Sequence, residues 1–524
     1  MNQIIKIALS VALLTLLAVS CTNLDIKPSS SVNNEVVFDD PGSYKAFIAR
    51  VYSGLAVSGQ QGPAGDSDIK GIDEGFGNYM RGDWQLQTLP TEEAVIGWSD
   101  ATLADLHAQT WEASDVFITA TYNRIYVQIS MANEFLREST DAKLSDRGVE
   151  GALYDDIQDY RAEARFLRAL SYWHGLDLFG NIPFVTEEDQ IGVEPPQQGT
   201  RAEIFNFIES ELKDIEDNLP APKTGDYGRA DQAAVWTLLA KIYLNAEVYT
   251  GTARYSDCRT YCEKVIGSAA YSLSPVYRYI FMADNNTSPE IIFPITYDGV
   301  RTQTWGGTTY LVNAAIGTPM DRTVYGVSEA WGGLRTTSTL VNRFPDETGD
   351  IDSRALFFTT GHTKEIEAIG TFEQGYALPK YSNIRSDSIP ASHTVHVDTD
   401  YPMFRLPDVY LMYAECVLRN GGGDKGLAVS YINEIRERAY GNTDGNIVAD
   451  DLTLDFVLDE RSRELYWEAM RRTDLIRFGQ FTSGIWPWKG GVKEGVASEA
   501  YRVLFPIPAS DIIANPNLTQ NEGY

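Results

Sequence analysis

Apolar side chains recur every three or four residues along much of the chain, which is the spacing of helices with one buried face. The helices predicted from this pattern span residues 41–55, 112–138, 155–179, 200–219 and 453–478. Gly180 ends the third of them, because glycine readily takes the conformation that closes a helix. Thr200 and Glu203 form a capping-box pair at the start of the fourth.

Two further helical stretches are each followed by a partner helix. Residues 230–247 precede a helix over 255–267, and a second stretch precedes a helix over 426–438. Both stretches have the spacing of the first helix of a tetratricopeptide repeat, at Trp236, Leu239, Ala240 and Tyr243 and again at Tyr410, Tyr413, Ala414 and Val417. Two matches are modest evidence for repeats, because aromatic and small residues share many buried helix faces.

Residues 58–111 and 271–400 have a different character. Both stretches are rich in Gly, Asp and Thr and are predicted to be mostly irregular, with short strand-like pieces such as residues 290–295. The chain is therefore predicted to be mostly α-helical, with few short strands. Binding residues are expected in the two long loop regions, because loops on a rigid scaffold commonly carry function.

The first 20 residues predict a signal peptide. Lys6 precedes an apolar run over residues 7–19, which is too short to span a membrane. The run ends in small residues before Cys21, as in the processing site of bacterial lipoproteins, so Cys21 is predicted to carry the lipid. The alternative is an ordinary signal peptide with an incidental cysteine. Residues 21–40 are then a polar tether that joins the lipid to the folded part.

Composition limits the partners. The chain has 73 acidic and 43 basic residues and a net charge of −30, so nucleic acid and anionic lipid surfaces would be repelled. Neutral ligands, cations and other proteins remain. Apolar residues make up 43% of the chain, which is enough for a large core.

No cofactor is expected from the motifs. The cysteines that remain after Cys21 form neither a disulfide framework nor a metal motif: Cys258, Cys262 and Cys416. His393 and His396 are predicted to lie at the surface. Asp284 could bind Ca²⁺ together with Asp398 or Asp400, but a purely structural role for these carboxylates is the preferred interpretation.

Several motifs along the chain resemble those of the SusD/RagB family of surface lipoproteins from Bacteroidetes. They are Arg161–Trp173 with Asp177–Gly180, Gly228–Asp231, Arg405–Glu415, Glu460–Glu464, Arg471–Gly479, Phe505–Pro508 and Asn515–Asn521. The resemblance implies one globular, mostly helical unit with four tetratricopeptide-like hairpins, made of an N-terminal part (41–270) and a C-terminal part (271–524). It also implies a glycan-binding protein without catalytic activity that sits on a SusC-like TonB-dependent porin in the outer membrane and faces the cell exterior.

Three tryptophans in polar loops are candidates for the glycan site. Trp98 follows a glycine, and Trp305 and Trp331 each precede a glycine pair, so these rings have few neighbours to bury them. The alternative for each is a ring tucked into the core. The resemblance places the three in an aromatic arc that binds starch, with Asp73 and Arg81 at its polar rim. Asp100 would stand in for an amide that is absent at Ala101. A curved arc favours α-1,4-glucan over straight β-glucans.

Other classes of function are weighed against this hypothesis. A glycoside hydrolase would use paired carboxylates such as Asp73/Glu74, Glu92/Glu93 or Glu187/Glu188, but adjacent residues rarely face one cleft. A peptide-binding assembly scaffold would use the concave face of the repeats. The same family role with a different glycan also remains open.

Overall fold

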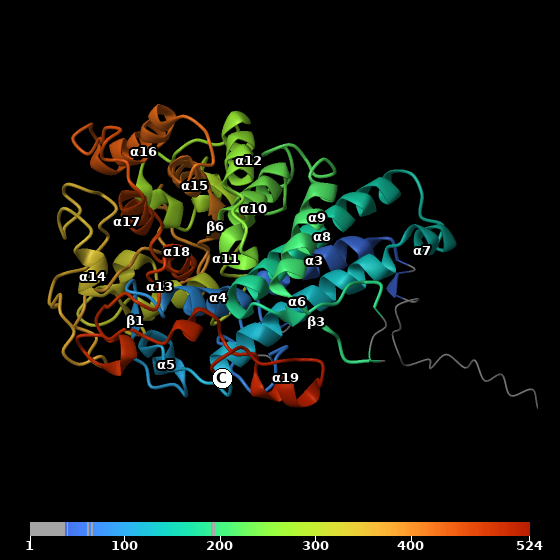
Figure 1. Cartoon of the computed structure of the whole chain (residues 1–524), viewed down its shortest axis with the longest axis horizontal. Coiled ribbons are helices and arrows are strands. Elements are labelled where there is room, and N and C mark those ends of the chain that lie inside the picture. Colours follow the sequence, from blue (N-terminus) through green and yellow to red (C-terminus); the bar gives the residue numbers. More distant parts are fainter. Residues whose placement is uncertain (1–36, 39, 60–61, 64–66, 190–191, 193) are drawn as a thin grey trace, which may run out of the picture. The chain divides into compact units, whose positions relative to one another are not determined.

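The computed structural model describes residues 37–524 apart from 39, 60–61, 64–66, 190–191 and 193 (Figure 1). Most of its regular structure is helical, as predicted. The longer helices are α3 (Gly42–Ala56), α4 (Tyr79–Thr88), α6 (Val116–Glu138), α8 (Ala152–Phe179), α9 (Arg201–Ile215), α10 (Gln232–Leu244), α12 (Tyr255–Gly267), α13 (Gly307–Ala314), α15 (Leu406–Leu418), α16 (Lys425–Tyr440) and α17 (Leu454–Leu465). The shorter ones are α5 (Leu103–Ala108), α7 (Asp141–Asp146), α11 (Ala246–Thr250), α14 (Ser338–Val341), α18 (Arg471–Arg477) and α19 (Ala509–Ala514).

Residues 44–524 form one compact unit. The predicted signal peptide, Cys21 and most of the tether lie outside the described residues. Within the described part of the chain, every helix is too short or too polar to cross a membrane.

Neighbouring helices pack in pairs. α6 packs on α8, α8 on α9, α10 on α12, and α15 on α16. The last two pairs confirm the pairing predicted for 230–267 and 410–438, while the repeat assignment stays a prediction. The predicted capping box is present, because Thr200 accepts from the amide of Glu203 and Glu203 accepts from the amide of Thr200. The α8 helix ends before Gly180, whose φ is 75°.

The strands form three small antiparallel pairs among the described residues. β1 (Val95–Ile96) pairs with β5 (Leu334–Arg335), and β2 (Ile182–Pro183) with β3 (Gln198–Gly199). β4 (Ile291–Ile295) pairs with β6 (Tyr401–Arg405), as the strand-like piece at 290–295 predicts. The β1–β5 pair joins the two loop regions, which are more than 200 residues apart in sequence.

The predictions missed α4 and a break in the last predicted helix. The region 58–111 contains α4, whose ten residues are all buried and therefore show no one-sided apolar pattern. The helix predicted over 453–478 is broken into α17 and α18 at Trp467, which has a φ of 61° and is fully buried against Trp84. Burying that ring requires the chain to leave the helical path.

Buried ion pairs join the C-terminal elements. Arg405 at the end of β6 donates to Glu290 (2.8 Å), Glu464 (2.6 Å) and Glu468 (2.6 Å). Burial alone would raise the pKa of Glu464, but nearby guanidinium groups, including Arg438, lower it to about 2. These motif residues therefore form an ionic core rather than a ligand site.

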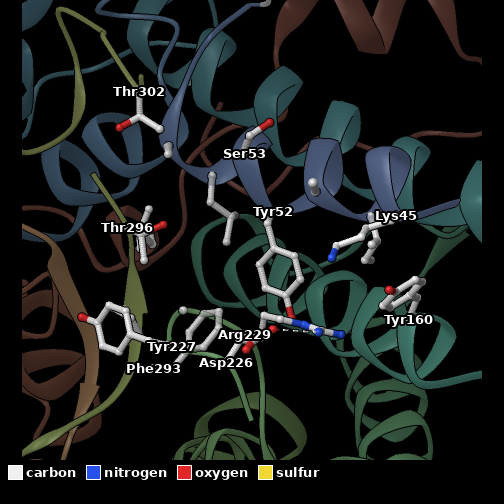
Figure 2. Close-up of a pocket in the computed structure, with 17 residues that line it drawn as sticks. Lys45, Tyr52, Ser53, Tyr160, Asp226, Tyr227, Arg229, Phe293, Thr296 and Thr302 are labelled. Carbon is white, nitrogen blue, oxygen red and sulfur yellow. Dashed lines mark hydrogen bonds and ion pairs between the residues drawn. The ribbon is translucent and has the colours of Figure 1, made fainter. Parts of the chain in front are cut away.

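A cavity of about 280 Å³ lies between α3, the loop before α10 and β4 (Figure 2). The Tyr52 hydroxyl donates to Glu163 (2.5 Å) and accepts from the amide of Ala230 (2.9 Å). The Tyr227 hydroxyl donates to Asp400 (2.7 Å). Both hydroxyls thus hold the loop before α10 in place. The two tyrosine side chains therefore present mainly their ring faces to the cavity.

Candidate functional site

The β1–β5 pair brings two of the predicted tryptophans together. Gly97 follows β1 and its amide donates to the carbonyl of Gly333 (3.0 Å), which precedes β5. Trp98 and Trp331 flank this contact, with ring centroids 6.3 Å apart. The indole Nε1 of Trp98 also donates to the Trp331 carbonyl (3.3 Å). The backbone pairing therefore fixes the spacing of the two rings.

Gly333 allows the Trp98 ring to lie across the chain. A Cβ atom at this position would be 2.3 Å from Cε2 of Trp98, which is far below a normal contact. In the sequence this glycine indicates that Trp331 has few neighbours, whereas the structure requires it for the packing of the Trp98 ring.

Trp305 is positioned by Glu74. One carboxylate oxygen of Glu74 accepts from the Thr304 hydroxyl (2.7 Å), and the other accepts from the Trp305 amide (2.9 Å). The backbone after Trp305 also lies close to Asn78. This approach needs glycine at position 306, because a Cβ of Gly306 would lie 2.3 Å from the Cβ of Asn78. The ring of Trp305 lies 6.1 Å from that of Trp331.

The three rings thus form a continuous row in the order Trp98, Trp331, Trp305, which we call the tryptophan platform. All three side chains are partly exposed, so each ring is anchored on one side and accessible on the other. Such a row offers flat apolar surfaces to a ligand with C–H faces, with polar groups around the edge.

The predicted polar rim is only partly as expected. Asp73 and Asp100 are exposed, whereas Arg81 is buried beneath the rings. Its guanidinium lies between the rings of Phe76 (3.8 Å) and Tyr310 (4.0 Å) and donates to the Trp305 carbonyl (3.3 Å).

Burial lowers the pKa of Arg81 to about 10, an effect that Tyr310, Asp73 and Asp100 partly offset. The Nε and Nη2 atoms of Arg81 have no hydrogen-bond partner among the described residues. The arginine thus supports the platform from below, where α4 places it, instead of standing at an open edge.

Sequence analysis missed several residues that hold the platform. Tyr310 on α13 lies edge-on to Trp98, with ring centroids 6.0 Å apart. Glu329 accepts a hydrogen bond from the indole of Trp331 (2.8 Å), and its position two residues before that ring was an available signal. His396 was expected at the surface but is 5% exposed and lies 4.7 Å from the ring of Trp305.

Each carboxylate pair weighed for hydrolysis has at least one member that is held by a structural partner. Besides Glu74, Glu92 accepts from Arg471 (2.6 Å) and Glu93 from the amide of Trp467 (2.9 Å). Burial raises the pKa of Glu93 to about 8. Glu187 pairs with Arg168. These partners hold the carboxylates in separate structural contacts.

The three carboxylates considered for Ca²⁺ also accept hydrogen bonds within the fold. Asp284 accepts from Ser386, Asp398 from Gly299 and Asp400 from the amide of Tyr297. The described residues contain no group of three or more His, Cys, Asp or Glu side chains arranged to hold a metal ion. The three carboxylates each order a loop.

Two family models match the chain. One, described as "Starch-binding associating with outer membrane", matches residues 74–244, and one described as "SusD family" matches residues 358–524. The "Starch-binding protein SusD" of Bacteroides thetaiotaomicron is 35% identical, with all of both chains covered. The chain belongs to the SusD family. A "SusD-like protein" of Bacteroides ovatus is 24% identical over 78% of this chain and 81% of that one.

Solved structures of other SusD-type proteins share the fold. Surface glycan-binding protein A from Bacteroides fluxus has a TM-score of 0.71 at 21% identity, covering 92% of this chain and 99% of that one. Surface glycan-binding protein A from Bacteroides thetaiotaomicron, in complex with laminarihexaose, has a TM-score of 0.68 at 20% identity, covering 91% and 98%. These likenesses show that the chain shares the fold of these two proteins over nearly its whole length.

Proposed function

We propose that this SusD-family protein captures starch-type α-1,4-glucan oligosaccharides at the cell surface and passes them to a SusC-like TonB-dependent porin. The observation that carries the proposal is the platform, in which Trp98, Trp305 and Trp331 come from three separate segments to form one accessible row of rings. The full-length similarity to a starch-binding relative supports α-glucan as the ligand.

Each part of the platform has a role in this proposal. The rings pack against the C–H faces of successive glucose units, and Asp73 and Asp100 accept hydrogen bonds from sugar hydroxyls. Arg81 keeps the rings in register from below and holds the Trp305 carbonyl. The protein binds and releases its ligand without cleaving it, because each weighed carboxylate pair has at least one member, Glu74, Glu92 or Glu187, held by a structural partner.

The proposed location is the outer face of the outer membrane, with Cys21 as the lipid anchor. The family model whose description mentions the outer membrane supports this placement. Three acyl chains on one residue would hold the protein stably, since two lipid signals already suffice for stable anchoring.

The test is calorimetry with maltoheptaose and α-cyclodextrin on the wild type and on a Trp98→Ala, Trp305→Ala, Trp331→Ala triple variant. Each ring is expected to contribute about 1 kcal/mol, so one ring lost weakens binding several-fold and three rings lost abolish it. The melting temperature of the triple variant serves as the control for folding. Unchanged affinity in a stable triple variant would refute the platform.

A different glycan is the second candidate, favoured by the laminarihexaose complex of a structural relative. Laminarihexaose and xylohexaose therefore belong in the same titration series. Tighter binding of either one would keep the platform and replace α-glucan as the ligand. New reducing ends released from amylose by the purified wild type would move the protein into the enzyme class.

A further inference from the structure

The row of rings continues beyond the tryptophan platform. The ring of His396 lies 4.7 Å from that of Trp305, and the ring of His393 is stacked on His396 at 5.4 Å with an interplanar angle of 27°. His393 is partly exposed and lines a cavity of about 460 Å³. A chain of ring contacts therefore leads from the platform to this cavity.

The cavity and the platform share one segment of chain. Val327 and Ser328 line the cavity, and Trp331 follows three residues later. The amide of Ser328 donates to the carbonyl of Thr394 (2.8 Å) across the cavity rim. The Asn383 side chain donates to the carbonyls of Gly326 (3.1 Å) and His393 (2.7 Å). These bonds fix both walls of the cavity to the loop that carries Trp331, the middle ring of the tryptophan platform.

The lining of this cavity is suited to a neutral polar ligand. Its polar side chains are Arg322, Thr323, Ser328, Asn383, Ser388, His393 and Thr394, and none of its lining residues is a carboxylate although the chain carries a net charge of −30. Ile389, which is 57% exposed, adds an apolar surface. Hydroxyl, amide and guanidinium groups around an apolar patch complement a sugar ring, and the volume lies in the usual range for ligand sites.

We propose that this cavity is an extension subsite, which takes further sugar units of a neutral oligosaccharide whose other end lies on the tryptophan platform. Sugar rings pack against His393 and Ile389, and their hydroxyls bond to Ser388, Thr394 and Arg322. This subsite rests on the proposed glycan function of the platform. It predicts that affinity rises with chain length beyond the units that the three tryptophans cover.

The experiment compares maltotriose with maltoheptaose by calorimetry. Thr394→Trp places a large ring at the cavity mouth. The substitution breaks no side-chain hydrogen bond, because the exposed Thr394 side chain makes none within the described chain. Thr252→Trp, at an exposed threonine in the turn between α11 and α12, is the matched control. Wild type and control should bind maltoheptaose at least about fivefold more tightly than maltotriose, an advantage of about 1 kcal/mol. In Thr394→Trp this length advantage should disappear while maltotriose binding is unchanged.

A second variant tests the ring of His393 separately from the hydrogen bonds that this side chain accepts. The His393 Nδ1 atom accepts from the amides of Val395 and His396, both at 3.1 Å. In His393→Asn the side-chain oxygen can accept these bonds while the ring face is lost, so the length advantage should fall with little change in melting temperature.

The outcomes separate the two proposals. Equal binding of both sugars by the wild type, or an unchanged length advantage in Thr394→Trp, overturns the subsite and leaves the platform intact. Loss of maltotriose and maltoheptaose binding to the same degree in Thr394→Trp also overturns it. Failure of the wild type to bind either sugar overturns the proposed α-glucan function, and the subsite with it.

Discussion

Gly333 determines, at the scale of one residue, where the ring of Trp98 lies. Its backbone accepts the bond from Gly97, and the missing side chain leaves the space that the indole fills. A methyl group there would push the ring away from its contact with Trp331. The platform therefore depends on a residue that need not touch the ligand.

We predict that Gly333→Ala lowers the affinity for maltoheptaose several-fold and destabilises the protein by about 1–3 kcal/mol, as overpacking usually does. Calorimetry and thermal unfolding measure the two effects. Gly370→Ala is the matched control, because a Cβ at this exposed glycine would have no atom within 4 Å. Wild-type affinity in Gly333→Ala would show that the ring position is not set by this contact.

Glu74 holds the other end of the platform. We predict that Glu74→Ala weakens glycan binding and costs about 1–3 kcal/mol in stability, because the amide of Trp305 loses its buried acceptor. Glu74→Gln should recover most of both losses, since its amide oxygen can accept from Trp305 while the Thr304 hydroxyl turns to accept from its nitrogen. Equal damage from both substitutions would point to a need for the charge itself.

The three rings were candidates from the sequence because tryptophan next to glycine in a polar loop is an unusual setting, and the family resemblance placed them in one arc. Apart from Glu329, which lies two residues before Trp331, their supports could not be predicted. Glu74, Tyr310 and His396 reach the platform through contacts across 91 to 231 positions of chain, and nothing in their local sequence marks them. Arg81 was predicted as part of the site, but its burial follows from α4, which the apolar pattern did not reveal.

Asp400 links three elements, just before β6. Its carboxylate accepts from the amide of Tyr297, which follows β4, and from the hydroxyl of Tyr227 in the loop before α10. Burial raises the pKa of Asp400 to about 7. The folded state therefore favours the protonated carboxyl, so its contribution to stability is complete below the unfolded pKa near 4 and declines as pH rises through about 7.

We predict that Asp400→Asn raises stability more at pH 8 than at pH 5, because the folded wild type still keeps this carboxyl mostly protonated at pH 5. The gain should be on the order of a few kcal/mol, since one pKa unit corresponds to about 1.4 kcal/mol. The asparagine can keep both hydrogen bonds. Denaturant unfolding at the two pH values checks this, and a variant that is less stable at pH 8 would contradict it.

Helices with one buried face were predicted well, because their apolar spacing is visible in the sequence: α6, α8, α9, α10 and α12 lie close to the predicted ranges. Elements that are buried on all sides were not predicted from the sequence. α4 has no exposed face to establish a period, and the break between α17 and α18 arises from the burial of Trp467. Tertiary packing decides both cases.

At the scale of the whole molecule, the predicted lipid at Cys21 determines where the platform works. We predict that Cys21→Ala abolishes metabolic palmitate labelling and releases the protein from the membrane fraction, while binding of maltoheptaose to the purified protein is unchanged. Labelling followed by detergent partitioning checks this. Continued labelling of the variant would show that another residue carries the lipid.

The platform draws its rings from positions 98, 305 and 331, joined through a two-residue strand pair. No short stretch of this chain can therefore be cut out as a working sugar-binding peptide. A chain halted after α12 during export would hold one ring and lack the other two. The proposed sugar capture then needs all three segments in place, so bound ligand reports that distant parts of the polypeptide have come together correctly.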